Sequence, residues 1–182
     1  MTIESGDGSS ELWQRVASED DAENALWSNL LLPEPERELE LAFSPLAVSP
    51  LALGIETIYE GYLVHYGRSR LFATDEPNLA LLLGDRLYAR GLVHVSRFGD
   101  VAAVADLATL LELCARLQAE SKQGDGALWA AGIASLGSGE IRAEGEAFLR
   151  SGDSEPLLRL ARGSAGIDPV ERALAVHTGR IS

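Results

Sequence analysis

The chain has a single cysteine and few basic residues, and each scarcity excludes a class of protein. Cys114 is the only cysteine among 182 residues, so neither an intrachain disulfide nor a metal site built from several cysteines can form. Fifteen Lys and Arg stand against 28 Asp and Glu, which gives a net charge of −13. We therefore expect no broad basic surface for nucleic acid, and interpret the acidic surface as a source of solubility.

Long apolar runs are also lacking. A run such as LALLL at 79–83 is far shorter than the roughly 18 residues that a membrane span needs, so no span is predicted. The opening MTIESGDGSS is polar and acidic, unlike the basic and apolar start of a secretion signal. The sequence predicts a cytoplasmic protein with a flexible leader at 1–10 and a single helical domain at 11–178.

Motifs of common enzymes and cofactor sites are absent. The sequence contains no Walker loop, no GxGxxG and no GxSxG. His65, His94 and His177 lie far apart and lack the HxxxH spacing of a zinc site. Cys114 lies in an apolar helical pattern and is interpreted as an inert core thiol. We therefore assign no catalytic residue, no metal and no cofactor.

The sequence does contain a series of helical patterns separated by turn signals. Apolar residues recur at helical spacing over about 50–66, 76–98 and 100–121, and shorter helices follow between glycine-rich turns. No alternating pattern lasts long enough to predict a strand. The fold class predicted is all-α, a single-domain helical bundle, with 100–121 as its central helix. The side chains expected in the core include Leu81, Leu83, Tyr88, Leu107, Leu111 and Leu117.

One aspartate stands among apolar residues of a predicted helix. Asp85 aligns with Leu81, Tyr88 and Leu92 on the apolar face, so we expect a buried structural carboxylate that ties helices together. A direct functional role for Asp85 is the alternative. Gly84 beside it predicts close approach by another helix.

Two other groups of acids have simple interpretations. Glu56 and Glu60 stand one helical turn apart, and without a third acid nearby they are interpreted as solvated. Asp20, Asp21 and Glu23 stand at a predicted helix start, where the helix dipole alone favours acids. Use of these three acids in a relocated active site is the alternative.

Three stretches resemble the trans-isoprenyl diphosphate synthase family, also called polyprenyl synthetases. ETIYEGYLVH at 56–65 matches the spacing of the helix that leads into the family's first aspartate-rich motif. LALLLGDRLYARGL at 79–92 is similar to a later family helix, and Gly84 and Asp85 fall on its Gly-Asp pair. GDGALWAAGIASLG at 124–137 is a looser match.

The resemblance implies an isoprenoid-synthase-like helical fold, but without the family's active site. In the family, the aspartates hold magnesium ions that neutralise the diphosphate of an allylic substrate. Here positions 66–70 read Tyr-Gly-Arg-Ser-Arg, so all three aspartates are missing. The chain is therefore expected not to be an enzyme by itself. Arg68 and Arg70 could still contact a phosphate directly.

The family includes short, motif-poor subunits that support a catalytic prenyl diphosphate synthase, and this chain resembles such a subunit. That resemblance implies a non-catalytic accessory or regulatory subunit, or an isoprenoid-binding scaffold with an apolar ligand. Its partner would be a catalytic prenyl diphosphate synthase subunit or a second copy of itself. A tunnel between the helices at 50–66 and 76–98 would support the isoprenoid version. The alternative is a helical protein–protein interaction domain unrelated to isoprenoid metabolism.

Overall fold

The computed structural model describes residues 12–16, 25–98 and 100–181, and over these ranges the chain is built from helices and loops. Within them, the one extended pairing is an isolated antiparallel bridge between Leu31 and Phe72. The predicted all-α class is confirmed, whereas the isoprenoid-synthase-like fold stays an expectation from the resemblance. The predicted leader and the acids Asp20, Asp21 and Glu23 lie outside the described residues.

Short elements precede the long helices. Residues 12–16 are helical, and after α2 (Ala25–Ser28) come three single turns of 3₁₀ helix, at Glu34–Glu36, Ser44–Leu46 and Ser49–Leu51. The remaining elements are α3 (Ala52–Tyr66), α4 (Pro77–Ser96), α5 (Val101–Ala119), α6 (Asp125–Ala134), α7 (Glu140–Ser151), α8 (Glu155–Ala165) and α9 (Ile167–Thr178). No helix in this described set combines the length and the apolar composition needed to cross a membrane.

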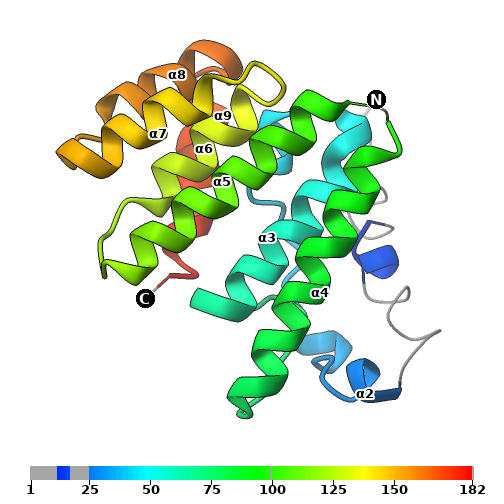
Figure 1. The fold of residues 1–182 in the computed structure, drawn as a ribbon. Helices are drawn as coiled ribbons and strands as arrows, with labels where there is room; N and C mark the ends of the chain where they lie inside the picture. The colour runs from blue at the N-terminus through cyan, green and yellow to red at the C-terminus, as the bar shows by residue number, and fades with distance from the viewer. Residues whose placement is uncertain (1–11, 17–24, 99, 182) are drawn as a thin grey trace.

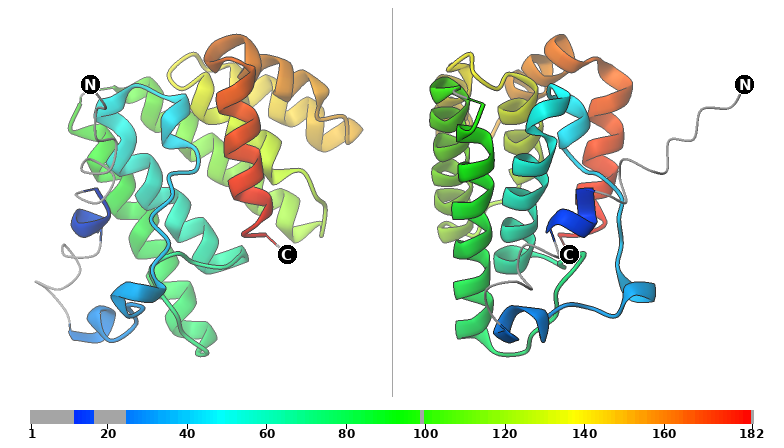
Figure 2. Two further views of the ribbon diagram at one scale, coloured as in Figure 1. Left: turned by 180° about the vertical axis from the view of Figure 1, so that it is seen from behind. Right: turned by 90° about the vertical axis from the view of Figure 1, so that its right-hand side faces the viewer.

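The helices are arranged in layers. In Figure 1, α4 and α5 lie at the front, meet at the turn between them and diverge toward their other ends. The right panel of Figure 2 shows α3 and α6 behind them, with α9 on the opposite side. Every residue from Gly54 to Leu63 and from Asp125 to Ile133 is buried, so α3 and α6 form the centre of the domain.

The prediction that the helix at 100–121 is central is wrong, because α5 exposes one side. Val101 is 80% exposed, and several alanines of this helix also face solvent. Asp106 of α5 is buried, and its Oδ2 accepts hydrogen bonds from the backbone nitrogens of Gly137 at 2.8 Å and Gly139 at 3.1 Å. A small apolar residue tolerates either environment, so the alanines did not reveal which side of α5 is buried.

α3 and α4 pack through four glycines, two on each helix. A Cβ atom at Gly61 would lie 2.8 Å from the carbonyl oxygen of Gly84, and one at Gly91 would lie 2.7 Å from the carbonyl oxygen of Gly54. The two backbones therefore approach as closely as only glycine permits. The close approach predicted from Gly84 is confirmed, and the contact leaves no space for an apolar tunnel between the two backbones at these levels.

The glycine contact also decides which side chains of α4 are buried. Leu83 and Leu87 flank it and are buried, whereas Leu81 is 55% exposed. The expectation of a buried Leu81 is therefore wrong. Of the other side chains expected in the core, Leu107 and Leu117 are buried, and Tyr88 and Leu111 are half-buried.

Candidate functional site at the end of α3

Arg70 is completely buried between two carboxylates of α3. Its Nη1 lies 2.7 Å from Glu56 Oε2 and its Nε lies 2.8 Å from Glu60 Oε2, and all three side chains are fully shielded from solvent. The guanidinium carbon also lies 4.2 Å from the ring centroid of Trp13. The interpretation of both glutamates as solvated is therefore wrong, and Arg70 is not accessible for a phosphate.

The three charges, here called the buried ion cluster, have hydrogen-bond partners on every side. Glu56 Oε1 accepts from the backbone nitrogens of Ala42 at 3.1 Å and Ser44 at 3.0 Å. Glu60 Oε1 accepts from the backbone nitrogens of Arg70 at 2.8 Å and Leu71 at 3.0 Å. The cluster thus fastens two loops to α3. Burial alone would lower the pKa of Arg70, but the two carboxylates outweigh burial and raise it.

Arg68, by contrast, lies at the surface and contacts Glu38, which precedes α3, and Arg180, which follows α9. Its guanidinium, 60% exposed, donates to Glu38, and the other oxygen of Glu38 accepts from Arg180. The hydrogen bonds from Arg180 and Arg68 lower the pKa of Glu38. The backbone nitrogen of Arg68 also donates to the carbonyl oxygen of Arg180 at 2.9 Å. The residues after α9 are thereby docked against the end of α3.

A pocket of about 430 Å³ opens beside Arg68. Two loops that pair through backbone hydrogen bonds form part of its wall. The nitrogen of Leu32 donates to the carbonyl oxygen of Leu71 at 2.7 Å, and the nitrogen of Ala73 donates to the carbonyl oxygen of Leu30 at 2.9 Å. Apolar side chains line it, together with polar and charged ones. The apolar group is Leu32, Leu63, Val64, Phe72, Ala73, Ala80 and Leu83, and the polar group is Glu36, Glu38, Arg68, Ser69, Thr74 and Asp75. We call this cavity the α3-end pocket.

The α3-end pocket adjoins the positions where the resemblance places a magnesium site. Those positions, 66–70, carry no carboxylate, so they offer none of the oxygen ligands that the aspartates of the family supply. Nowhere in the described part of the chain do three His, Cys, Asp or Glu side chains gather in a way that could hold a metal ion. The residues present therefore do not fit the magnesium ions of the family, and we derive no reaction step through them.

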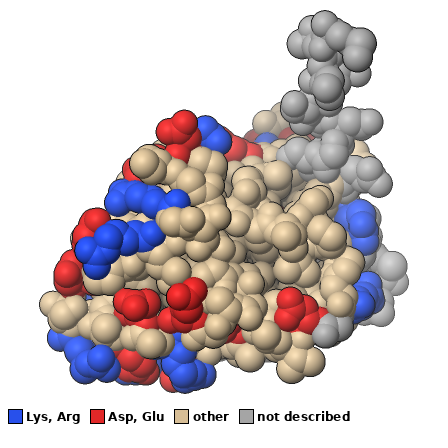
Figure 3. All heavy atoms as spheres, turned by 90° about the horizontal axis from the view of Figure 1, so that it is seen from above, with Lys and Arg blue, Asp and Glu red and all other residues tan. Residues whose placement is uncertain are grey.

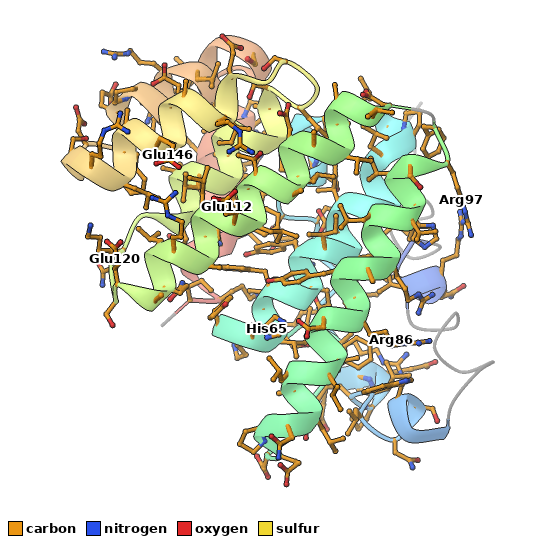
Figure 4. All side chains as sticks on the ribbon, in the orientation of Figure 1. His65, Arg86, Arg97, Glu112, Glu120 and Glu146 are labelled. Carbon is orange, nitrogen blue, oxygen red and sulfur yellow. The ribbon has the colours of Figure 1, made fainter. Side chains whose placement is uncertain are left out.

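Asp85 is on the surface of α4, not in the core. Its side chain is 66% exposed, and its Oδ1 lies 3.3 Å from Nε2 of His65. The prediction of a buried structural acid is wrong, because α4 packs against α3 through its glycines and not through the side of the helix that carries Asp85. Gly84 makes room for the imidazole, since a Cβ atom there would lie 2.3 Å from His65 Nε2. Figure 4 shows His65 at the end of α3, facing α4.

Replacing Asp85 should have a small effect on stability. We expect Asp85→Asn to change the free energy of unfolding by less than about 1 kcal/mol, because one partner of the pair is exposed. Burial lowers the pKa of His65, while Asp85 opposes that effect, so the variant should lower the pKa of this histidine further. Urea unfolding followed by circular dichroism and an NMR titration of the imidazole measure the two effects. A loss of several kcal/mol would contradict the surface position of Asp85.

A second buried group of polar side chains links four helices. The hydroxyl of Tyr59 lies 2.9 Å from His177 Nδ1, and His177 Nε2 lies 3.2 Å from Asp125 Oδ2. The same carboxylate oxygen accepts from the hydroxyl of Tyr62 at 2.6 Å, which accepts from Gln118 Nε2 at 2.8 Å. With its proton on Nε2, the imidazole of His177 donates to Asp125 and accepts from the hydroxyl of Tyr59, so both of its hydrogen bonds are satisfied. Sequence reasoning missed the network, because its members are scattered from position 59 to position 177.

The Asp125 carboxylate should make stability depend on pH. Burial would raise the pKa of Asp125, but hydrogen bonds from His177 and Tyr62 outweigh burial and lower it. Because the folded pKa lies below the unfolded one, this stabilisation is complete above about pH 4 and is lost as pH falls through the folded pKa. Below about pH 4, the free energy of unfolding should therefore fall more steeply for the wild type than for Asp125→Asn. Urea unfolding at a series of pH values measures both slopes, and equal slopes would contradict the assignment.

Comparison with known protein families, with curated proteins and with solved structures finds no match for this chain. The end of α3 is therefore interpreted from its own chemistry. The ion cluster and the His177 network are closed to solvent and hold elements together. The α3-end pocket is open, and apolar side chains, three carboxylates and Arg68 line it.

Proposed function

We propose that this chain is a non-catalytic helical subunit that binds another helical protein through α4 and the turn from α4 to α5. One observation carries the proposal. Five of the nine large apolar side chains exposed among the described residues belong to this stretch of chain. They are Leu81, Leu82, Val93, Phe98 and Val101, and we call them the α4 patch.

Charged residues lie on the same stretch of chain as the α4 patch. Figure 3 looks onto the end of the domain where α4 turns into α5, and charged residues lie toward the edges of this face; Leu81 and Leu82 lie toward the other end of α4. Figure 4 shows Arg86 and Arg97 on the edge of α4 that faces away from α5. Apolar side chains surrounded by charged ones are typical of surfaces that bind proteins.

The partner that the sequence favours is a catalytic prenyl diphosphate synthase subunit. The support for it is the resemblance at 56–65 and 79–92 together with the missing aspartates at 66–70. An isoprenoid-binding scaffold has less support, because the glycine contact closes the space between α3 and α4 where a tunnel was expected. A second copy of the chain, or a partner outside isoprenoid metabolism, is the alternative occupant of the α4 patch.

Activity and binding assays with a catalytic synthase from the same source test the proposal. Given Mg²⁺, an allylic diphosphate and isopentenyl diphosphate, the chain alone should form no prenyl product. It should bind the synthase and change the rate or chain length of its products. Phe98→Asp should weaken binding about tenfold or more, because it places a charge in an apolar interface.

Ile167→Asp is the matched control, since Ile167 is 63% exposed but lies outside the α4 patch. This variant should bind as the wild type does. Product formation by the chain alone would overturn the non-catalytic assignment. If the chain does not bind the synthase but forms a dimer that Phe98→Asp dissociates, as measured by light scattering, the α4 patch binds a second copy of the chain.

A further inference from the structure

We infer that the α3-end pocket binds an organic cation with an apolar body, such as an alkylammonium ion. This inference concerns a different surface from the α4 patch and does not rest on it. The cavity of about 430 Å³ lies within the roughly 300–1,000 Å³ that small-molecule sites occupy. Its apolar lining includes Leu63 and Val64 of α3, Phe72, and Leu83 of α4, so an alkyl group would find an apolar surface.

The charges that line the pocket favour a cation. Glu36, Glu38 and Asp75 contribute three carboxylates, whereas Arg68 contributes the single guanidinium. That guanidinium already donates to Glu38, which also accepts from Arg180. The carboxylates of Glu36 and Asp75 make no hydrogen bond or ion pair with any described residue, so both are free to accept from a ligand.

The end of α3 also makes the electrostatic potential in the pocket more negative. Leu63, Val64 and Gly67 line the pocket at the point where α3 ends, so the negative end of the helix dipole lies beside the cavity. The whole chain is also acidic, with a net charge of −13. Both effects raise the local concentration of cations and oppose anions.

Other ligand classes fit the pocket less well. A diphosphate would have to compete with Glu38 for Arg68 and would approach two unpaired carboxylates. A metal ion finds no group of three suitable ligands in the described part of the chain. Two other cavities differ in chemistry. One of about 270 Å³ carries a single carboxylate, Glu34, and a single guanidinium, Arg37. One of about 220 Å³ on α4 has no carboxylate and is lined by Ala89, Arg90, Val93, His94 and Arg97. The excess of carboxylates over an apolar floor is thus particular to the α3-end pocket among these cavities.

Calorimetry with three probes of similar size tests the inference. Hexylammonium should bind the full chain, whereas hexanoate and hexanol should bind at least about tenfold more weakly, since each lacks the charge-assisted hydrogen bonds to the carboxylates. Glu36→Gln and Asp75→Asn should each weaken hexylammonium binding about two- to fivefold, because both carboxylates are exposed. Arg68→Gln should strengthen it, because Glu38 then becomes available to the ligand.

Glu34→Gln is the matched control, since Glu34 belongs to the same 3₁₀ turn as Glu36 but does not line this pocket. It should leave the affinity unchanged. So should Phe98→Asp, which separates this test from that of the α4 patch. Equal binding of hexanoate, no binding of any probe, or wild-type affinity in both Glu36→Gln and Asp75→Asn would each overturn the inference.

Discussion

Arg70→Met is expected to lower the free energy of unfolding by about 3–5 kcal/mol. The substitution leaves the carboxylates of Glu56 and Glu60 in the core without the guanidinium that lies between them. A buried carboxylate that loses its partner must keep an uncompensated charge or take up a proton, and both are unfavourable. Because domains of this size are stable by only about 5–15 kcal/mol, the variant should unfold at a much lower urea concentration.

Arg68→Met is the control for this experiment. Arg68 also pairs with a glutamate, but its side chain is 60% exposed and Glu38 is 45% exposed. Its loss should therefore cost no more than about 1 kcal/mol. Urea unfolding of both variants at pH 7, followed by circular dichroism, gives the comparison. Similar losses for the two variants would show that burial does not distinguish the two arginines.

Gly91→Ala is expected to lower the free energy of unfolding by about 3 kcal/mol, the upper end of the range that is typical of overpacked cores. The added Cβ atom would lie 2.3 Å from Ile58 Cγ1 and 2.7 Å from the carbonyl oxygen of Gly54. A side chain could rotate away, but the backbone of α3 cannot move without separating the two helices. The substitution should therefore push α4 away from α3 around Gly91.

Gly163→Ala provides a control with the opposite sign. Gly163 lies in α8, and a Cβ atom there would meet nothing within 4 Å. Alanine should stabilise this helix by about 0.5–1 kcal/mol, because it restricts the unfolded chain more than glycine does. Thermal unfolding of both variants measures the effects. A loss at position 163, or no loss at position 91, would contradict the packing described here.

The sequence predicted the helical class and most helix positions, because apolar periodicity and capping residues act locally. Asp100 caps α5 as its position suggests, with its Oδ1 2.8 Å from the nitrogen of Ala103. α4 begins at Pro77, and its cap is Glu76, whose side chain accepts from the nitrogen of Asn78. Such local signals place a helix within a residue or so, but they do not say which face is buried.

The site was harder to predict, because its charges are balanced by residues distant in the sequence. Glu56 and Glu60 stand on one helical face, and only the fold of the following loop brings Arg70 between them. The apolar pattern predicts the wrong environment for Asp85, because glycine backbones and not the largest apolar side chains of α4 make the contact with α3. The sequence did contain a signal for the buried ion cluster. Two acids lie on one apolar face of a predicted helix, and an arginine follows soon after that helix.

The glycine contact between α3 and α4 also has a consequence for motion. Two backbones in contact at Gly54–Gly91 and at Gly61–Gly84 would bring neighbouring side chains into a clash if they slid along each other, so we expect the pair to move as one unit. Phe98 and Val101, on either side of the turn from α4 to α5, are instead exposed. In a hydrogen-exchange experiment, the amides of α3 should exchange only through global unfolding, whereas those at the start of α5 should open locally.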